Sequence, residues 1–441
     1  MSVAENLSTV FKVATILAVA LSSSLARASS QSYIYEQLYA FPGGTNGYGP
    51  EGALVQATNG YFYGTCSAGG QPTSNCPTCG YGTVFRISPA GVFTTLAWFN
   101  ANGEINGAYP FGQMVQASDG NLYGDSEYGL FRVTPDGVLT GRGGGAWVGD
   151  PIQGTDGFLY YVNSDTIFRS PPIWATGMQW SAPGTPSSGL IQATDGNFYG
   201  LTSSGGTSGF GTAYKLTPSG TLTTLVSFGG TNIGRWPYGK MLQASDGNLY
   251  GVCGSPEQVF KLTLSGTLTT FAVFGTNGDL GYNPNGGLIE ANDGNFYGTT
   301  YAGGGIAGGS GGTVFKLTPQ GRISMLIAFT TVGAYPGSWP LAGLVQGSDG
   351  NLYGVCAYGG AYGGGNVFRI LMPGPQLNIS HTPNQLILSW RTNYTGFTLQ
   401  GSDGLSPPNW TDRTNSPAVS GGQYWMTNLI SSGAQFFRLR K

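Results

Sequence analysis

The chain has 441 residues, of which 77 are glycine and only 9% are charged, against about a quarter in an ordinary globular protein. Its formal net charge of −2 is too small to attract nucleic acid electrostatically. Hydrophobic residues make up 40% of the chain and aromatic residues 13%, and they recur at fixed repeat positions, which excludes a disordered glycine-rich protein.

Residues 1–28 are predicted to be a secretory signal. Lys12 precedes a short apolar run, residues 13–19, and Ala26-Arg27-Ala28 supplies the small residues of a cleavage site. Removal of the segment leaves 16 basic and 19 acidic residues, a net charge of about −3. The alternative is an uncleaved membrane anchor, but the run is shorter than a bilayer span. We expect an exported protein, located at the cell surface, in the periplasm or in the medium, with no membrane span after signal removal.

A hairpin motif returns seven times along the chain, most plainly as Asp119-Gly120-Asn121-Leu122-Tyr123-Gly124. The spacing between copies suits one blade of four short strands. The sequence therefore predicts an all-β fold, a seven-bladed β-propeller over residues 32–372. The other copies are residues 59–64, 156–160, 195–200, 246–251, 293–298 and 349–354.

The unit over residues 189–228 shows how one blade is built. A short apolar strand, residues 190–193, is followed by Asp195-Gly196-Asn197, whose residues tolerate a tight hairpin. The second strand begins at Phe198 and the third covers residues 212–216. Thr217-Pro218-Ser219-Gly220 then has the pattern of a type I turn and leads to the fourth strand, residues 221–228. Helical periodicity is absent from the unit.

The phase of the repeat predicts how the ring closes. The last unit stops after its third strand, residues 366–370, and lacks a fourth. Residues 33–41, which precede the first unit, match the fourth-strand pattern that ends in phenylalanine. We expect residues 33–41 to pair with residues 367–370, because this closure removes the open edge of a linear array.

A basic residue occupies the same place in the third strand of every unit, and six units carry an aspartate in the first turn. We expect local pairs between them, since both lie toward the same end of the blade. One carboxylate per turn is poor ligation for calcium, which requires about six to eight oxygens, so we predict no metal. The basic residues are Arg86, Arg132, Arg169, Lys215, Lys261, Lys316 and Arg369.

Five cysteines fall into two groups. Cys66, Cys253 and Cys356 occupy one slot of the repeat, which is typical of small buried packing residues. Cys76 and Cys79 lie in an insertion found only in the first unit. For an exported protein, we predict a disulfide within Cys66, Cys76 and Cys79 rather than a redox or zinc centre.

The connections between blades carry the candidate ligand-binding residues. Both tight turns of a blade fall on one face, so the long, variable loops gather on the other face, where a ligand could be met. Each inter-blade connection has an aromatic residue just ahead of a proline, and flat rings suit the apolar faces of sugars. The alternative is that the rings wedge between blades. The candidates are Tyr48, Tyr109, Trp147, Trp180, Trp236, Tyr282 and Trp339.

Catalytic chemistry is sparsely provided. The single histidine, His381, lies outside the repeats, which excludes histidine-based triads and multi-histidine metal centres from the propeller. Asp125 and Glu127, with Glu104 and Asp150 in adjoining connections, could form an acid–base pair for a glycoside. Some acidic residues cluster by chance, however, so we predict no catalytic residue and no cofactor.

The repeat unit resembles the GloVer, or choice-of-anchor, tandem-repeat family of exported bacterial proteins. The resemblance is carried by Gly-Leu-Ile/Val-Gln, Asp-Gly-Asn-Leu/Phe-Tyr-Gly and Gly-Thr-Val-Phe-Lys-Leu-Thr-Pro-x-Gly over residues 50–370. The second unit departs from it by a short loop, residues 125–129, and the third by a degenerate motif, residues 156–161. The resemblance implies propeller-type repeats and no particular activity.

Residues 375–441 are predicted to form a separate small β-sandwich. A Pro-Gly-Pro hinge at residues 373–375 precedes alternating strands that resemble immunoglobulin- or fibronectin-like modules, which usually space, sort or adhere. The whole is predicted to be a monomeric, non-enzymatic binding protein whose partner is a polysaccharide or a cell-surface protein, with carbohydrate as the first ligand to test. A carboxylate-dependent glycoside hydrolase or lyase and a cell-envelope scaffold are the alternatives.

Overall fold

The computed structural model describes two compact units. One comprises Ile34–Ala291 and Asn295–Leu371, and the other includes the residues from Met372 onward. The predicted signal segment lies outside the described residues, and among those described no helix is long and apolar enough to cross a membrane. The described residues are 33–71, 80–100, 108–141, 148–172, 177–229, 234–275, 279–304, 311–330, 333–375, 377–382, 385–391, 397–404, 409–429 and 435–440.

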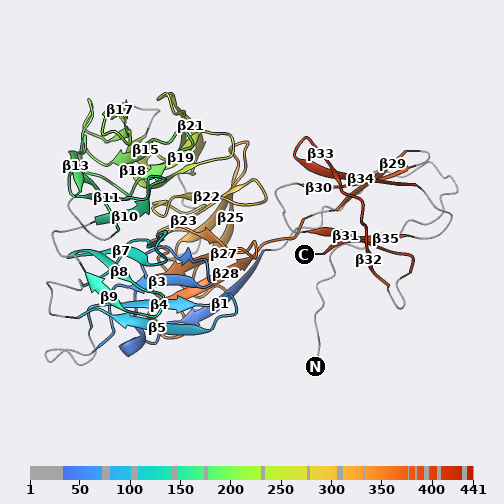
Figure 1. The fold of residues 1–441 in the computed structure, drawn as a ribbon, viewed down its shortest axis with the longest axis horizontal. Helices are drawn as coiled ribbons and strands as arrows, with labels where there is room; N and C mark the ends of the chain where they lie inside the picture. Colours follow the sequence, from blue (N-terminus) through green and yellow to red (C-terminus); the bar gives the residue numbers. More distant parts are fainter. Residues whose placement is uncertain are drawn as a thin grey trace. The chain divides into compact units, whose positions relative to one another are not determined.

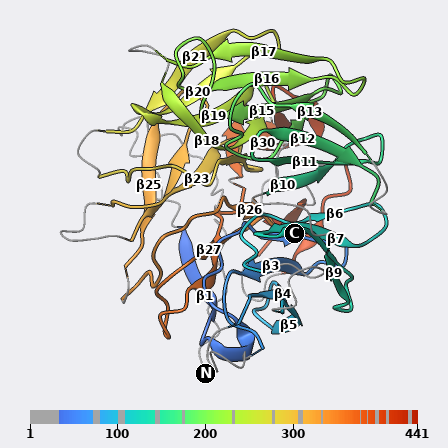
Figure 2. The same cartoon turned by 90° about the vertical axis from the view of Figure 1, so that its left-hand side faces the viewer.

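Within the described residues, the larger unit contains seven four-stranded antiparallel sheets, which follow one another as the blades of a propeller (Figure 1; Figure 2). Blade 1 is β2 (Val55–Gln56), β3 (Phe62–Cys66), β4 (Thr83–Ile87) and β5 (Phe93–Trp98); blade 2 is β6 (Val115–Gln116), β7 (Leu122–Ser126), β8 (Gly129–Val133) and β9 (Leu139–Gly141). Blade 3 is β10 (Val148–Gln153), β11 (Leu159–Asn163), β12 (Thr166–Ser170) and β13 (Met178–Ser181); blade 4 is β14 (Ile191–Gln192), β15 (Phe198–Thr202), β16 (Thr212–Leu216) and β17 (Leu222–Ser227). Blade 5 is β18 (Arg235–Gln243), β19 (Leu249–Ser255), β20 (Glu257–Leu262) and β21 (Leu268–Val273); blade 6 is β22 (Leu288–Glu290), β23 (Phe296–Thr300), β24 (Thr313–Leu317) and β25 (Ile323–Ala328). The predicted all-β, seven-bladed fold is confirmed.

The seventh blade is closed by the N-terminal strand. It contains β26 (Val345–Gln346), β27 (Leu352–Cys356) and β28 (Asn366–Leu371), and β1 (Ile34–Ala40) forms its outer strand. The register places Glu36 opposite Arg369 and Ala40 opposite Asn366. The Phe41 N–H then donates a 3.0 Å hydrogen bond to the Gly365 carbonyl. The predicted pairing of residues 33–41 with the last repeat is therefore confirmed.

The second strand of each blade is the most deeply buried, and its glycine is required by packing. A Cβ placed on Gly64 would lie 2.5 Å from the Phe85 ring of the third strand, and the same close approach recurs in five other blades. Blade 3 differs because Tyr161 replaces the glycine; its ring stacks on Phe168 at 5.2 Å with an interplanar angle of 9°. The degenerate third motif therefore still forms a blade, in which the Tyr161 ring packs where the other blades have a glycine.

The turn aspartates have a partner that the sequence analysis did not identify. In five blades the hydroxyl of the repeat tyrosine donates to the aspartate, as Tyr123 does to Asp119 at 2.7 Å. Burial alone would raise the pKa of Asp119, but hydrogen bonds from Tyr123 and Asn121 outweigh it and lower the pKa. The predicted pairing with a basic residue is found within the described residues as Asp156–Arg169 at 3.0 Å and Asp246–Lys261 at 2.8 Å. In blade 7, Arg369 instead pairs with Glu36 of the closing strand.

A belt of side-chain amides joins neighbouring blades. The glutamine at the end of a first strand accepts a hydrogen bond from a turn N–H of the preceding blade, as Gln192 does from Thr155 at 2.8 Å. The belt crosses the closure, where Gln56 accepts from Ser348 at 2.7 Å, and Glu290 replaces glutamine in blade 6. The remaining contacts of this kind are Thr58–Gln116, Ser118–Gln153 and Thr194–Gln243. The belt therefore links the blades around the same face as the tight turns.

The cysteine slot of the repeat holds buried thiols. Cys66, Cys253 and Cys356 are free and buried, and burial raises the pKa of the Cys66 thiol well above its usual value. Of the three cysteines considered for a disulfide, Cys66 is therefore excluded, because its free thiol is packed inside blade 1. Cys76 and Cys79 lie outside the described residues, so a bridge between them stays a prediction.

The C-terminal unit contains two small sheets. One has the order β29 (Asn378–His381), β30 (Gln385–Arg391), β34 (Gln423–Leu429) and β33 (Ala418–Ser420); the other has β32 (Thr411–Asp412), β31 (Thr398–Ser402) and β35 (Phe436–Arg440). Leu388, Trp390 and Phe437 lie at the centre of the core of this unit. The unit is thus a small all-β module, and its likeness to immunoglobulin- or fibronectin-like modules stays an expectation.

Candidate functional site

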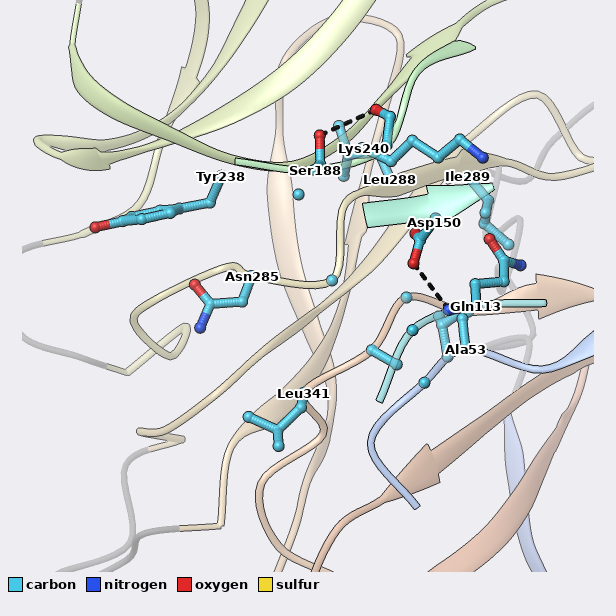
Figure 3. A pocket seen from close by; sticks show the side chains of 18 of the residues that line it. Ala53, Gln113, Asp150, Ser188, Tyr238, Lys240, Asn285, Leu288, Ile289 and Leu341 are labelled. Carbon is cyan, nitrogen blue, oxygen red and sulfur yellow. Dashed lines mark hydrogen bonds between the residues drawn. The ribbon is translucent and has the colours of Figure 1, made fainter. Parts of the chain in front are cut away.

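The seven inner strands surround a central cavity of about 880 Å³ (Figure 3). Every blade contributes residues to it, from Glu51–Ala53 in blade 1 to residues 341–346 in blade 7. Most lining positions belong to the segment that leads from the inter-blade proline into the first strand of a blade. A cavity of this size falls within the range of small-ligand sites, which is about 300–1,000 Å³.

The repeats place different side chains at the same position of the cavity lining. The residue after the Pro-x-Gly of the repeat is Ala53 in blade 1, Gln113 in blade 2 and Lys240 in blade 5, and Asp150 follows Gly149 in blade 3. Figure 3 shows Asp150, Gln113 and Lys240 on one side of the cavity, with Leu341 across from them. Ala53 and Ile289 lie beside these polar residues and Asn285 lies on the side of Leu341, so polar and apolar groups are mixed around the cavity.

Asp125 is the most unusual residue of the lining. Its place on the second strand is filled by apolar residues or threonine in the other blades, for example Leu201, Val252 and Val355. The Asp125 side chain is only 1% exposed, and neither carboxyl oxygen has a hydrogen-bond partner of normal geometry within the described residues. The carboxyl lies directly over Gly112, where an added Cβ would be 1.9 Å from Oδ1. Glycine at position 112 thus creates the space that Asp125 occupies.

The ionisable groups of the cavity perturb one another. Burial raises the pKa of Asp125 well above its usual value, and the charge of Asp150 raises it further, whereas the nearby backbone N–H groups of Asp125 and Gly112 oppose the shift. Burial lowers the pKa of Lys240, and Asp150 offsets part of this effect. Asp150 itself accepts a 2.8 Å hydrogen bond from the Gln113 N–H. The surroundings of Asp125 thus favour the neutral form of its carboxyl, because burial and the neighbouring Asp150 both disfavour a charge there.

The carboxylates that share the cavity differ from the pair suggested by the sequence. Asp125 and Asp150 both line the cavity, whereas Glu127 does not and instead lies near Tyr109 on the long-loop face. The reason is local: β7 ends at Ser126, and Glu127 already belongs to the following turn. The suggested Asp125–Glu127 pair was therefore wrong. Glu104 lies outside the described residues.

Three of the seven predicted aromatics occupy one special backbone position. Tyr109, Trp236 and Trp339 directly precede a proline and have φ values of 51°, 52° and 55°. Gly49 and Asn283 hold the same place in blades 1 and 6, with φ of 66° and 55°. In all five of these blades the N–H of this residue donates to the preceding blade, to a backbone carbonyl in four of them, as Trp236 does to Phe210 at 3.0 Å, and to the Glu257 carboxylate at 3.2 Å in blade 6. At this position the backbone links two blades, and glycine or asparagine adopts the same conformation there as the aromatic residues do.

The rings at these joints are partly packed and partly exposed. Tyr109 and Trp236 are 41% and 40% exposed, and each lies near an aromatic ring of the preceding blade. The Tyr81–Tyr109 and Phe210–Trp236 centroid distances are 5.8 and 5.7 Å. Trp339 is half-buried between Tyr301 and Tyr358, at 5.3 and 4.7 Å. The rings therefore form small aromatic clusters at the blade junctions.

The other predicted aromatics are placed differently. Tyr48 and Tyr282 precede their proline by two residues and bridge by backbone hydrogen bonds to Ala68 and Ala302, and Tyr282 is 41% exposed. Trp180 lies in the outer strand β13 rather than in an inter-blade connection, with its indole nitrogen against Gly220 of blade 4. Trp147 lies outside the described residues. None of the six described aromatics lines the central cavity, where Phe111 and Tyr238 supply rings that the sequence analysis did not single out.

Comparison with sequence families gives a partial match. The model of the Gloeobacter/Verrucomicrobia repeat matches residues 258–406, about a third of the chain. This match agrees with the resemblance of the repeat units to a tandem-repeat family. A search of the curated proteins found no match.

Solved structures with the same architecture are numerous and remote in sequence. A catalytically inactive variant of virginiamycin B lyase from Staphylococcus aureus, crystallised with quinupristin, has a TM-score of 0.55 at 15% identity, covering 77% of this chain and 100% of that one. A streptogramin B lyase gives 0.55 at 13% identity, with 78% and 98% coverage. The extracellular domain of a proposed one-component system from B. thetaiotaomicron gives 0.52 at 12% identity, covering 91% of this chain and 54% of that one. At these identities the likeness establishes the propeller fold alone.

Proposed function

We propose that this protein is an exported, non-enzymatic carbohydrate-binding propeller whose long-loop face holds a polysaccharide through the junction aromatics. The observation that supports this most is the presence of Tyr109, Trp236 and Trp339 in left-handed backbone, where glycine or asparagine serves in other blades. A large side chain in that conformation costs about 1–2 kcal/mol. The fold therefore does not require these rings, and exposed aromatic surface on the loop face suits the apolar face of a sugar.

Glycine substitutions separate binding from packing. In Trp236→Gly and Tyr109→Gly the backbone keeps its conformation, as at Gly49, so Tm should change by no more than about 3 °C. Binding to the polysaccharide should weaken by about 2 kcal/mol, roughly thirtyfold in Kd, because an anchoring ring is lost. Glycan-array screening of the full chain followed by calorimetry on the strongest ligand measures this effect.

Val92→Ala serves as a control, because this exposed side chain lies at the turn between the third and fourth strands, on the opposite face. It should leave Kd unchanged. A large fall in Tm for the glycine variants, with sugar affinity retained, would show that the rings act only as wedges between blades.

A carboxylate-dependent glycosidase or lyase is the second candidate, and it is favoured by the convergence of Asp125 and Asp150 on one cavity. This candidate predicts that the protein cleaves a bound oligosaccharide and that the cleavage is lost in Asp150→Asn. Chromatography of the oligosaccharide after incubation with the full chain tests it, and an unchanged ligand leaves binding as the function.

A further inference from the structure

A basic side chain and two aromatic rings meet at the junction between blades 4 and 5. The guanidinium carbon of Arg235 lies 4.4 Å from the centroid of the Phe210 ring. The exposed Trp236 ring lies 5.7 Å from the same ring, at an interplanar angle of 78°. Phe210 belongs to the long loop between β15 and β16, whereas Arg235 and Trp236 are the first two residues of β18. The three side chains therefore form one cluster on the long-loop face.

The guanidinium of Arg235 keeps its capacity to bind an anion. Within the described residues its N–H groups have no hydrogen-bond acceptor and its charge has no acidic partner. Arg235 is only half-buried and its nitrogens remain open to solvent, in contrast to the Nε of Arg86, which is sealed off without a partner. Glu257, in the loop-side hairpin of the same blade, instead accepts from the Asn283 N–H of blade 6 at 3.2 Å.

The other repeats show that the fold does not require this cluster. Glycine takes the place of Phe210 in blades 6 and 7, where the carbonyls of Gly311 and Gly364 accept the same junction hydrogen bond. Blade 5 is also unusual in having a charged residue just before the left-handed junction position. The four other blades with such a position have Tyr48, Ala108, Tyr282 and Ser338 there.

The junction between blades 1 and 2 is a neutral counterpart of this cluster. Tyr81 and Tyr109 form a similar pair of rings there, with centroids 5.8 Å apart, and Ala108 takes the place of Arg235. The two junctions thus present comparable aromatic surfaces that differ by one positive charge.

That charge decides which ligand chemistry fits the blade 4–5 junction. An exposed indole suits the C–H face of a sugar ring. A guanidinium is charged at any physiological pH, and its paired N–H groups match the oxygens of a carboxylate or a sulfate. A cationic sugar would be repelled by Arg235, and a neutral one would leave the charge without a partner.

We propose that the blade 4–5 junction is a subsite for an acidic sugar, in which Trp236 stacks on the sugar ring and Arg235 binds its carboxylate or sulfate ester. This inference rests on the proposed carbohydrate binding and specifies the ligand class. Hydrogen bonds between charged partners are about twice as strong as neutral ones, so the contact with Arg235 provides the selectivity.

The test compares acidic sugars with their neutral match. The full chain is screened on an array of galactose- and glucose-based oligosaccharides, each in a neutral, a uronic acid and a sulfated form. Calorimetry then measures the strongest acidic ligand and its neutral form, and the acidic form should bind at least about tenfold more tightly. The uronic acid and sulfated forms identify which anionic group is bound.

Substitution of Arg235 tests the source of this preference. Arg235→Ser gives blade 5 the Ser-Trp-Pro sequence of blade 7, so Tm should change by no more than about 3 °C, while the preference for the acidic form should be lost. Arg322→Ser removes the same charge from an exposed residue beside a tight turn on the opposite face, and it should leave the preference unchanged. In the parent protein, raising NaCl from about 0.05 to 0.5 M should reduce the preference, because salt screens a half-buried ionic contact.

The outcomes distinguish this inference from the proposed function. Equal or tighter binding of the neutral form overturns the acidic subsite, as does a preference that survives Arg235→Ser or is insensitive to salt. If the two forms bind equally and both weaken in Trp236→Gly, the carbohydrate function stands while the acidic subsite is rejected. Absence of binding to every array glycan rejects both.

Discussion

Replacing Phe41 by alanine is expected to lower the free energy of unfolding by about 3–5 kcal/mol. Phe41 follows the closing strand and is fully buried, with its ring 5.1 Å from Tyr39, 5.3 Å from Phe85 and 5.6 Å from Phe93. Phe85 and Phe93 belong to blade 1, whereas β1 belongs to blade 7. The substitution therefore opens a cavity at the point where the first and last blades meet.

Urea unfolding followed by tryptophan fluorescence measures the effect. Ile34→Ala is the matched control, because this residue lies at the other end of the same strand and is 50% exposed. It should cost no more than about 0.5 kcal/mol. Equal effects of the two substitutions would contradict a closure that depends on packing at Phe41.

Asp125→Asn is expected to make the protein more stable at pH 8 and to change little at pH 4. The folded-state pKa of Asp125 is raised, first by burial and then by Asp150, whereas the unfolded value is about 3.9. Between these two values the native state binds more protons than the unfolded state, so the unfolding free energy of the parent protein falls as pH rises. The slope is about 1.4 kcal/mol per pH unit, and asparagine removes it because it does not ionise.

Thermal unfolding of both proteins between pH 4 and 8 measures the difference. Asp150 acts on Asp125 and also on Lys240, and Glu51 and Glu290 are further ionisable residues that line the same cavity. The lowered pKa of Lys240 has the opposite sign, adding stability as pH rises in the alkaline range, and it is common to both proteins. Stability curves that run parallel from pH 4 to 8 would show that the Asp125 carboxyl ionises normally.

Much of the architecture could be predicted because it depends on local signals. Each Asp-Gly-Asn hairpin and each Thr-Pro-x-Gly turn joins two neighbouring strands through a few residues, so the turn motifs predict the strand order. The strands β14–β17 lie within the residues predicted for that unit. The closure followed from one missing strand in the phase of the repeat. The position of the junction aromatics was also visible, although Trp180 lies in an outer strand.

The interactions between blades were not visible in the same way. The Gln192–Thr155 contact joins residues 37 positions apart, and the Gln56–Ser348 contact joins residues 292 apart. A glutamine at the end of a short strand has no sequence signal that indicates its partner. The tyrosine–aspartate hydrogen bond spans only four residues, and its regular spacing could have suggested it.

The sequence by itself determined the number of blades, their strand order and the closing strand, because turn chemistry and alternation act over a few residues. Only the tertiary structure decided that Asp125 and Glu127, two residues apart, face different environments, and that Asp125 lines one cavity with Asp150 and Lys240 from other blades. Burial and charge at a propeller centre depend on segments that are distant in the chain. Their combination exists only once the ring has closed.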